Sequence, residues 1–363
     1  MVKEWRNLFE KEESMGKLSI LDSDEKGIIS RLERSVCDVL RELIDGNKRG
    51  QIYSSTCLVS VMNILHRNVK EGFHSTLRDI YYNNPSLYTK QSISDKYIAQ
   101  VTHLVHTPRE LLNVVSTARG RIRGPLVIQG SEFGLSAGRS ERREVRLDCM
   151  SVFESMGHSI SPYLFKRMNG LKFTYYSKIK FVLVVEKDTI FQRLLEFGFH
   201  KEFDNSCILI TARGFSDLPT RTLLYRLSQD LPEDTKFWIL CDYDCFGLSI
   251  AATYVMGGKS DTWYDSSFNI SKLLPIRVPP VSKLIESKLI TNDNVFNMTE
   301  DEISRIVNTR NRLISSKEIS EESKLEWNLV CQQMQEDQKR FEIDCIVGIE
   351  EWLVRLIKST LQE

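Results

Sequence analysis

The sequence predicts a mixed α/β protein in which a helical module precedes a parallel-sheet domain. Between residues 26 and 106 the apolar side chains recur at spacings of three and four, which is the period of amphipathic helices. From about residue 180 onward, three short and continuous apolar runs alternate with three helical patterns. Continuous apolar runs indicate strands that are buried on both faces, and their alternation with helices is typical of a parallel sheet covered by helices.

The helical module carries clear start and stop signals. Gly72 stops the second helix, and Pro108 closes the last one. Thr76 and Asp79 have the spacing of a capping box, which predicts the start of a short helix between them. We expect helices over residues 26–45, 55–70, 76–82 and 92–106.

Two short strands are expected next, at residues 111–117 and 125–130, on either side of a basic turn. Apart from the short helix at 76–82, the order is three helices followed by a hairpin with a basic tip, which is the order of a winged helix, a duplex-DNA-binding module. Arg119, Arg121 and Arg123 would then contact phosphates. The alternative is a small helical domain with an exposed basic turn, and the pattern alone does not decide between the two.

The parallel-sheet domain follows a change of period at about residue 179. Its expected strands are 180–186, 207–211 and 236–242, and its expected helices are 188–198, 219–229 and 246–256. Beyond residue 270 the chain reads as mostly helical and acidic, with an amphipathic last helix over 348–361. The expected organisation is a flexible arm (1–25), a winged-helix domain (26–148), and a sheet domain with a helical C-terminal extension (149–363).

The composition describes a folded protein without net charge. Of the 363 residues, 41% are apolar and 27% are charged, which excludes a disordered chain. The 49 basic and 49 acidic residues balance, and a pI near 7.0 argues against a free-standing, tight nucleic-acid binder without excluding a basic groove. Eight cysteines without a C-x-x-C motif favour reduced thiols over disulfides or zinc. No apolar run has the length of a membrane helix and no signal peptide is visible, so we expect an intracellular protein with no membrane partner.

Three carboxylates follow the expected parallel strands. Glu186 ends the first strand, and Asp242 and Asp244 end the third. In an extended segment Asp242 and Asp244 point to the same side, and neighbouring strands would bring Glu186 beside them. Three gathered carboxylates repel one another unless a cation neutralises them, and hard oxygen ligands suit Mg²⁺. An Asp-x-Asp pair alone is more often part of a solvated loop, so the prediction depends on the glutamate at the end of a neighbouring strand.

The arrangement VLVVEKDTIFQRL, followed by ILCDYDCFG, resembles the toprim domain of topoisomerases, primases and related nucleases. Between them, TARGFSDLPTRTLLYRL is similar to a segment found in topoisomerase VI, in its A-type chain, and in the meiotic relative of that chain, the sporulation protein eleven family; Ser216 stands in place of the usual proline. STLRDIYYNNPSLY resembles that family's Arg-x-x-Tyr/Phe-Tyr motif, and PRELLNVVSTARGRIRG resembles its Ser-Lys-Gly region, with Arg119 in place of lysine. The resemblance spans about residues 30–350.

The resemblance implies a DNA-cleaving tyrosine. A phenol has a pKa of about 10 and needs a nearby cation or base to act as a nucleophile at neutral pH. Arg78 lies one helical turn before both Tyr81 and Tyr82, so spacing does not choose between the two tyrosines. The family pattern does, because its nucleophile is the second of the pair, which here is Tyr82.

The resemblance also implies the cofactor and the partners. Mg²⁺ would be held by Glu186, Asp242 and Asp244, and Asp242 or Asp244 is the candidate ligand of a second ion. The product would be a covalent 5′-phosphotyrosyl link at a meiotic double-strand break in the nucleus. The family acts as a homodimer with composite active sites, together with meiotic accessory proteins and a topoisomerase VI B-like subunit. The lack of an ATP-binding motif in this sequence fits that dependence on a B-type partner.

Other functions remain open on the sequence alone. The chain could be the A-type chain of a topoisomerase VI that relaxes or decatenates DNA. A toprim nuclease or primase would use the carboxylates but no tyrosine, and a non-catalytic recombination scaffold would bind DNA without forming an adduct. A phosphatase of the Asp-x-Asp type ranks last, because its motif belongs on the first strand of the sheet and not on the third.

Overall fold

A computed structural model describes residues 25–45, 49–115, 118–136, 139–151, 156–162, 168–257 and 265–362. The described chain divides into two compact units, and each is considered by itself. The first unit contains residues up to 118 with two short later segments, and the second contains 119–160, 170–259 and 268 onward. The expected arm lies outside the described residues, except for Glu25, which begins the first helix. None of the described helices is long and apolar enough to cross a membrane.

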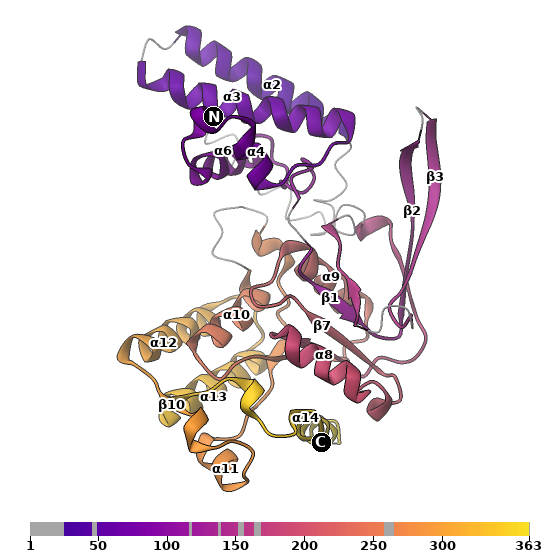
Figure 1. The fold of residues 1–363 in the computed structure, drawn as a ribbon, viewed down its shortest axis with the longest axis vertical. Helices are drawn as coiled ribbons and strands as arrows, with labels where there is room; N and C mark the ends of the chain where they lie inside the picture. The colour runs from indigo at the N-terminus through magenta and orange to yellow at the C-terminus, as the bar shows by residue number, and fades with distance from the viewer. Residues whose placement is uncertain are drawn as a thin grey trace. The chain divides into compact units, whose positions relative to one another are not determined.

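The first unit is helical in its described residues, and the predicted helices are present (Figure 1). The capping box is confirmed, since the Thr76 side chain accepts from the Asp79 amide and the Asp79 carboxylate accepts from the Thr76 amide. Tyr88 is fully buried and donates a hydrogen bond to the Ser60 hydroxyl at 3.0 Å. The helices are α2 (Glu25–Asp45), α3 (Arg49–Glu71), α4 (Leu77–Asn83), α5 (Pro85–Tyr88) and α6 (Gln91–Leu104).

The predicted strand at 111–117 is wrong. The described part of this segment forms turns, and its one strand-like feature is an isolated parallel bridge between Ser75 and Val114. Its backbone is used instead in turns that return to Pro108 and Arg109, whose carbonyls accept hydrogen bonds from amides three to five residues later. Residues 116 and 117 lie outside the described part.

The predicted basic hairpin turn is also wrong. Arg121–Arg123 form strand β1, which pairs antiparallel with β7 (Cys207–Thr211) in the sheet of the second unit. Ile122 is fully buried there, opposite Ile210. A Cβ at Gly124 would lie 2.9 Å from the Ile208 side chain, so the segment is packed closely against its neighbour. The boundary predicted at 148/149 therefore differs from the observed one at 118/119, because residues 119–148 pair with the second unit.

The second unit is built on a six-stranded sheet of order β4-β1-β7-β6-β8-β9. Strands β7, β6 and β8 are parallel, as predicted from their continuous apolar runs, and every residue of β6 is buried. Strand β9, which was not predicted, pairs parallel with β8 at the other edge of the sheet. The antiparallel pair β4 and β1 forms one edge. The remaining bounds are β4 (His158–Ser159), β6 (Phe181–Val185), β8 (Lys236–Leu240), β9 (Leu273–Pro275), α8 (Asp188–Phe197), α9 (Leu218–Asp230) and α10 (Cys245–Met256).

A separate three-stranded antiparallel sheet is formed by β2 (Leu126–Ser136), β3 (Arg139–Asp148) and β5 (Lys172–Tyr175), with β2 in the centre. The strand predicted at 125–130 is therefore present, but its hairpin partner is β3 and not residues 111–117. In Figure 1 the β2–β3 hairpin is a long two-stranded ribbon.

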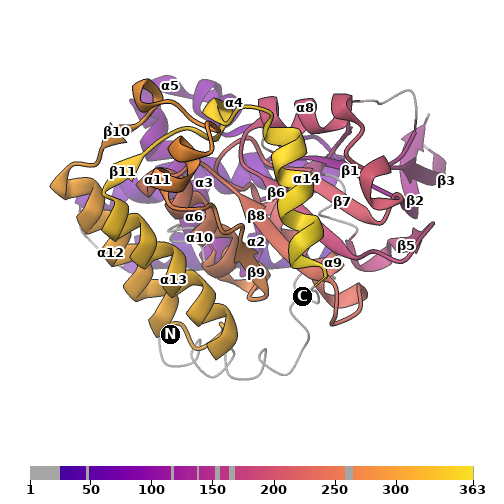
Figure 2. The same cartoon turned by 90° about the horizontal axis from the view of Figure 1, so that it is seen from below.

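The C-terminal part is mostly helical, as expected. Figure 2 shows α12 and α13 side by side, and α14 packs against α8. The last helix is amphipathic, with Trp352, Leu353 and Ile357 buried. All eight cysteines are free thiols. The elements are α11 (Val281–Glu286), β10 (Phe296–Asn297), α12 (Glu300–Ser315), α13 (Glu321–Asp337), β11 (Lys339–Arg340) and α14 (Ile349–Thr360), with short 3-10 turns at Met168–Gly170, Lys201–Phe203, Asp265–Phe268, Asn292–Asn294 and Ile343–Cys345.

Candidate active site

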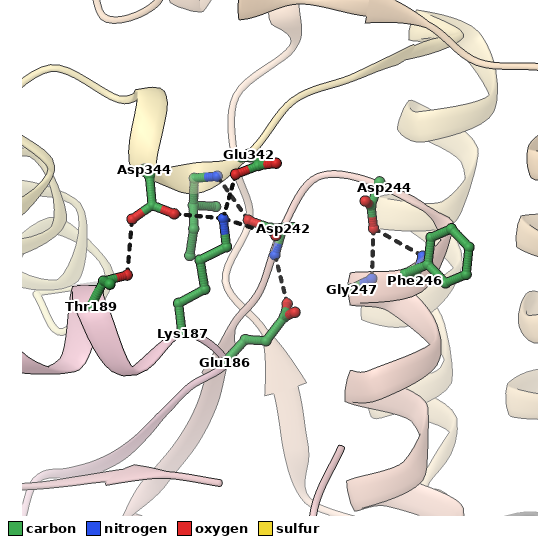
Figure 3. Close-up of polar contacts among 10 residues, drawn as sticks. Glu186, Lys187, Thr189, Asp242, Asp244, Phe246, Gly247, Glu342 and Asp344 are labelled. Carbon is green, nitrogen blue, oxygen red and sulfur yellow. Dashed lines mark hydrogen bonds and ion pairs between the residues drawn. The ribbon is translucent and has the colours of Figure 1, made fainter. Parts of the chain in front are cut away.

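Glu186 and Asp242 meet at the carboxyl ends of two paired strands. Val185 of β6 pairs with Leu240 of β8, so the residues that follow emerge at the same edge of the sheet. The Glu186 amide donates to the Leu240 carbonyl at 2.9 Å, and the Glu186 carboxylate accepts from the Asp242 amide at 2.9 Å. Glu186 is 8% exposed, so its carboxylate is largely removed from water (Figure 3).

Asp242 is held by a segment about 100 residues later in the chain. One of its carboxylate oxygens accepts from the Ile343 amide at 2.9 Å. Its other oxygen lies 3.2 Å from the Lys187 ammonium. Both oxygens therefore have partners, which fixes the direction in which this carboxylate points.

Asp244 caps a helix and does not face Glu186 and Asp242 in the way that was expected. It is the N-cap of α10, and its Oδ1 accepts from the Phe246 amide at 2.9 Å and from the Gly247 amide at 2.7 Å. Figure 3 shows Asp244 directed at the start of α10 while Asp242 faces Lys187, so the expectation that both point to one side is wrong. The cause is the cap, which satisfies amides that have no partner within the helix.

Gly247 makes the tight entry into α10 possible. A Cβ at this position would lie 2.3 Å from the Asp242 carbonyl oxygen, closer than any real side chain could lie. The backbone between the two aspartates thus turns back on itself, and only glycine leaves room for that turn.

Burial dominates the electrostatics of the two strand-end carboxylates. Burial raises the pKa of Glu186, the Asp242 amide and Lys187 lower it, and the Asp242 and Asp244 charges raise it, with a net value of about 7. Burial also raises the pKa of Asp242, while the Ile343 amide and Lys187 act in the opposite direction. Ionised Glu186 is therefore costly near neutral pH, and a bound cation would reduce that cost.

The carboxylates fit a divalent cation by donor chemistry, because hard oxygen ligands are those that Mg²⁺ prefers. Among the described residues, however, no group of three or more His, Cys, Asp or Glu side chains is arranged to hold a metal ion. Lys187 engages Asp242, and the cap engages Asp244. Cation binding by the three residues stays a prediction.

Three charged residues beside this site were not predicted from the sequence. The Lys187 ammonium lies 2.9 Å from Glu342 Oε2 and 2.5 Å from Asp344 Oδ2, in addition to its contact with Asp242 (Figure 3). Lys187 could have been noticed because it directly follows Glu186. Glu342 and Asp344 carried no signal, since they lie in a generally acidic region with no motif.

The tyrosine pair lies on α4 of the first unit. Tyr82 is 60% exposed, and the Arg78 guanidinium carbon lies 6.0 Å from the centre of its ring. The rings of Tyr81 and Tyr82 are 5.1 Å apart, and Tyr81 is less exposed than Tyr82. Ile80 is the buried residue of this short helix, two positions before Tyr82. Tyr82 is thus the more accessible of the two phenols, with a cation one turn away.

The three arginines expected on DNA have different surroundings. Arg119 is exposed. An Arg121 guanidinium nitrogen lies 3.8 Å from an Asp188 carboxylate oxygen, and Arg123 donates to the Ser151 carbonyl at 2.7 Å. Arg121 and Arg123 therefore belong to the edge of the six-stranded sheet, and of the three only Arg119 keeps the exposure that the wing hypothesis required.

Both halves of the chain match models of known families. The model for the toprim domain of topoisomerase 6 (A-type chain) and Spo11 matches residues 181–355, and the model described as type IIB DNA topoisomerase matches residues 53–114. The resemblance to topoisomerase 6 A-type chains and Spo11 is confirmed by these two matches. The predicted α/β fold with a toprim sheet is confirmed, and the winged-helix assignment agrees with the type IIB topoisomerase match even though its wing was misplaced.

Relatives in this family support both branches of the resemblance. Meiotic recombination protein SPO11-2 of Oryza sativa subsp. japonica is 35% identical over 205 residues, which cover 55% of this chain and 48% of the relative. SPO11-1 of Arabidopsis thaliana is 34% identical over 217 residues (60% and 54%). The A3 chain of DNA topoisomerase 6 from Oryza sativa subsp. indica is 30% identical over 213 residues (59% and 43%). The chain spans about half the length of these relatives.

The matched segments contain most of the candidate residues. Arg78 and Tyr82 fall within the type IIB topoisomerase match, and Glu186, Asp242 and Asp244 fall within the toprim match. Toprim domains generally bind divalent metal ions, which agrees with the donor chemistry at the ends of β6 and β8. The three arginines at 119–123 lie between the two matches.

Proposed function

We propose that this chain forms DNA double-strand breaks in meiotic recombination by tyrosine transesterification. The observation that carries the proposal is the exposed Tyr82 with Arg78 one turn away, in a segment that matches a type IIB DNA topoisomerase, on the same chain as a toprim carboxylate site. A nucleophile must reach its substrate, and the exposure of Tyr82 supports its role over that of Tyr81.

The reaction exchanges one phosphoester for another. The Tyr82 hydroxyl oxygen bonds to the phosphorus of a DNA backbone phosphate as its phenolic proton passes to solvent. The bond from phosphorus to the 3′ oxygen breaks, and that oxygen takes up a proton to become a 3′-hydroxyl. The products are a 5′-phosphotyrosyl link and a free 3′ end, and no external energy source is needed. Arg78 would stabilise the phenolate or the phosphate charge.

Glu186, Asp242 and Asp244 would hold the divalent cation, for which we propose Mg²⁺. Bound there, the ion supplies positive charge for the phosphate oxygens and the leaving oxygen. The protein's own contribution is to keep Glu186 and Asp242 at one sheet edge, with their carboxylates fixed by the backbone amides of Asp242 and Ile343.

Cutting a duplex requires two tyrosines, so the proposed active form is a homodimer with composite sites. The tyrosine of one protomer would act at the carboxylates of the other. Meiotic accessory proteins and a topoisomerase VI B-like subunit would complete the assembly in the nucleus. The similarity to A-type chains of topoisomerase 6 supports a second, B-type chain, and the similarity to meiotic recombination proteins supports a role in meiosis.

A basic pocket beside Asp244 supports DNA binding by the second unit. It has a volume of about 370 Å³ and lies between α10 and α12. The α12 side brings Arg305 and Arg312, seven residues apart and so on one helix face, and the α10 side brings the exposed ring of Phe246. No acidic residue lines the pocket in the described part of the chain, so we propose that DNA phosphates bind there. The other lining residues are Cys245, Ser249, Asn308 and Thr309.

A second candidate is the A-type chain of a topoisomerase VI, which the 30% identity to the A3 chain of topoisomerase 6 favours. End-labelled duplex incubated with the full chain, a B-type partner and Mg²⁺ and then denatured tests both. We expect protein-linked 5′ ends for the wild type and Tyr81→Phe, and none for Tyr82→Phe. Metal-dependent cutting that survives Tyr82→Phe would indicate a nuclease, and DNA binding without any adduct would indicate a scaffold. Relaxation of supercoiled DNA would favour the topoisomerase.

A further inference from the structure

Lys187 joins the strand-end carboxylates to the C-terminal segment. Its ammonium contacts Asp242, Glu342 and Asp344, which come from two segments about 100 residues apart. The second oxygen of Asp344 accepts from the Thr189 hydroxyl at 3.1 Å. One ammonium is therefore shared by three carboxylates, one of which is a proposed metal ligand (Figure 3).

The segment 341–344 is fastened to Asp242 and its neighbour by the backbone. Tyr243 and Phe341 exchange two amide–carbonyl hydrogen bonds of 3.1 and 3.2 Å, and their rings stack 5.1 Å apart. Ile343 then donates to Asp242 at 2.9 Å, between the two acids that contact Lys187. The Asp242 carboxylate thus lies in an enclosure formed by Lys187 and segment 341–344, with the Ile343 amide on one of its oxygens and the Lys187 ammonium on the other.

The charge balance at this enclosure is unfavourable without a cation. Asp242, Glu342 and Asp344 contribute three carboxylates in direct contact with the one ammonium of Lys187, and the buried Glu186 carboxyl lies beside Asp242. The Asp242 oxygen nearest to Lys187 is also an oxygen that a divalent cation would use. The ammonium and the divalent cation therefore compete for the same oxygen, but Lys187 has two further acids to which it can remain bound.

We propose that Lys187 is a tethered counter-cation that regulates divalent-cation binding at Asp242. Without metal it neutralises Asp242. When a divalent cation binds, Lys187 leaves Asp242 and stays with Glu342 and Asp344. The inference rests on the proposed metal site. Lys187 is a positioning residue in this scheme, because it acts on the cation through Asp242 and not on the DNA.

Titration of the full chain with Mn²⁺, followed by calorimetry and by the electron paramagnetic resonance of free Mn²⁺, tests this directly. Lys187→Met removes the competing charge, so we expect Mn²⁺ to bind about tenfold more tightly or better than to the wild type. Lys187→Arg keeps the charge and should bind Mn²⁺ within about threefold of the wild type.

A second variant protects the test against misfolding of Lys187→Met. Glu342→Gln combined with Asp344→Asn leaves Lys187 only Asp242 as a partner, so we expect weaker Mn²⁺ binding, the opposite sign. Unchanged or weaker binding by folded Lys187→Met, or unchanged or tighter binding by the double variant, would overturn the inference alone. Failure of the wild type to bind Mn²⁺ in a manner that Asp242→Asn abolishes would overturn the metal site itself.

Discussion

Replacing Glu186 with glutamine should remove a pH dependence of stability. Burial raises the pKa of Glu186 from 4.5 to about 7 in the folded chain. The folded state then holds a proton that the unfolded state has released, so the free energy of unfolding falls as pH rises from about 4.5 to about 7. The difference between the two values is about 2.5 (7 − 4.5). One pKa unit corresponds to about 1.4 kcal/mol, so protonation of Glu186 changes the free energy of unfolding by about 3 kcal/mol over this pH range.

Urea unfolding in EDTA between about pH 4.5 and pH 8, followed by tryptophan fluorescence, measures this effect. The wild type should lose about 3 kcal/mol more than Glu186→Gln over that range. Glu196→Gln is the control, because it removes an exposed carboxylate of α8. Its free energy of unfolding should depend on pH as that of the wild type does. Parallel curves for the wild type and Glu186→Gln would refute the claim that burial of this carboxylate costs stability.

Two further predictions concern the backbone turn and the basic pocket. Gly247→Ala should lower the free energy of unfolding by about 1–3 kcal/mol in urea titrations, because the added Cβ would lie 2.3 Å from the Asp242 carbonyl oxygen. Gly170→Ala is the control: in the described part of the chain no atom apart from its direct neighbours lies within 4 Å of its added Cβ, so the free energy of unfolding should not change. Equal stability of the two variants would contradict the close approach. The double variant Arg305→Gln/Arg312→Gln should bind duplex DNA with a weaker salt dependence. In fluorescence anisotropy, the slope of the logarithm of the binding constant against the logarithm of salt concentration should fall by about 2, because each lost phosphate contact removes about 0.9. Arg355→Gln, an exposed arginine of α14, is the control, and an equal change there would argue for nonspecific charge.

The parallel sheet could be predicted from the sequence because its signals are local. The buried runs that became β6, β7 and β8 are continuous and apolar, and each is followed by a helix of the expected length. The edge strand β1 could not be predicted. Ile122 stands between two arginines and resembles an exposed turn, and only its pairing with Ile210, almost 90 residues later, buries it. Pairing across that distance leaves no trace in the local pattern.

In the candidate site, too, one feature could be predicted from the order of the elements and others could not. The closeness of Glu186 and Asp242 follows from two parallel strands ending at one edge, a rule that needs only the order of elements. The direction of Asp244 does not follow, because extended geometry and helix capping make different demands on it and the cap prevails. The contacts of Lys187 with Glu342 and Asp344 join residues more than 150 positions apart, so they needed coordinates.

Tyr82 should be the residue to which the cleaved DNA becomes covalently attached. Covalent protein–DNA complexes trapped by denaturation can be digested with nuclease and protease, and the peptides that retain nucleotide can be sequenced by tandem mass spectrometry. We expect a nucleotide joined through its 5′ phosphate to the hydroxyl of Tyr82, formed only with a divalent cation. The same mass on Tyr81, or on a residue outside α4, would contradict it.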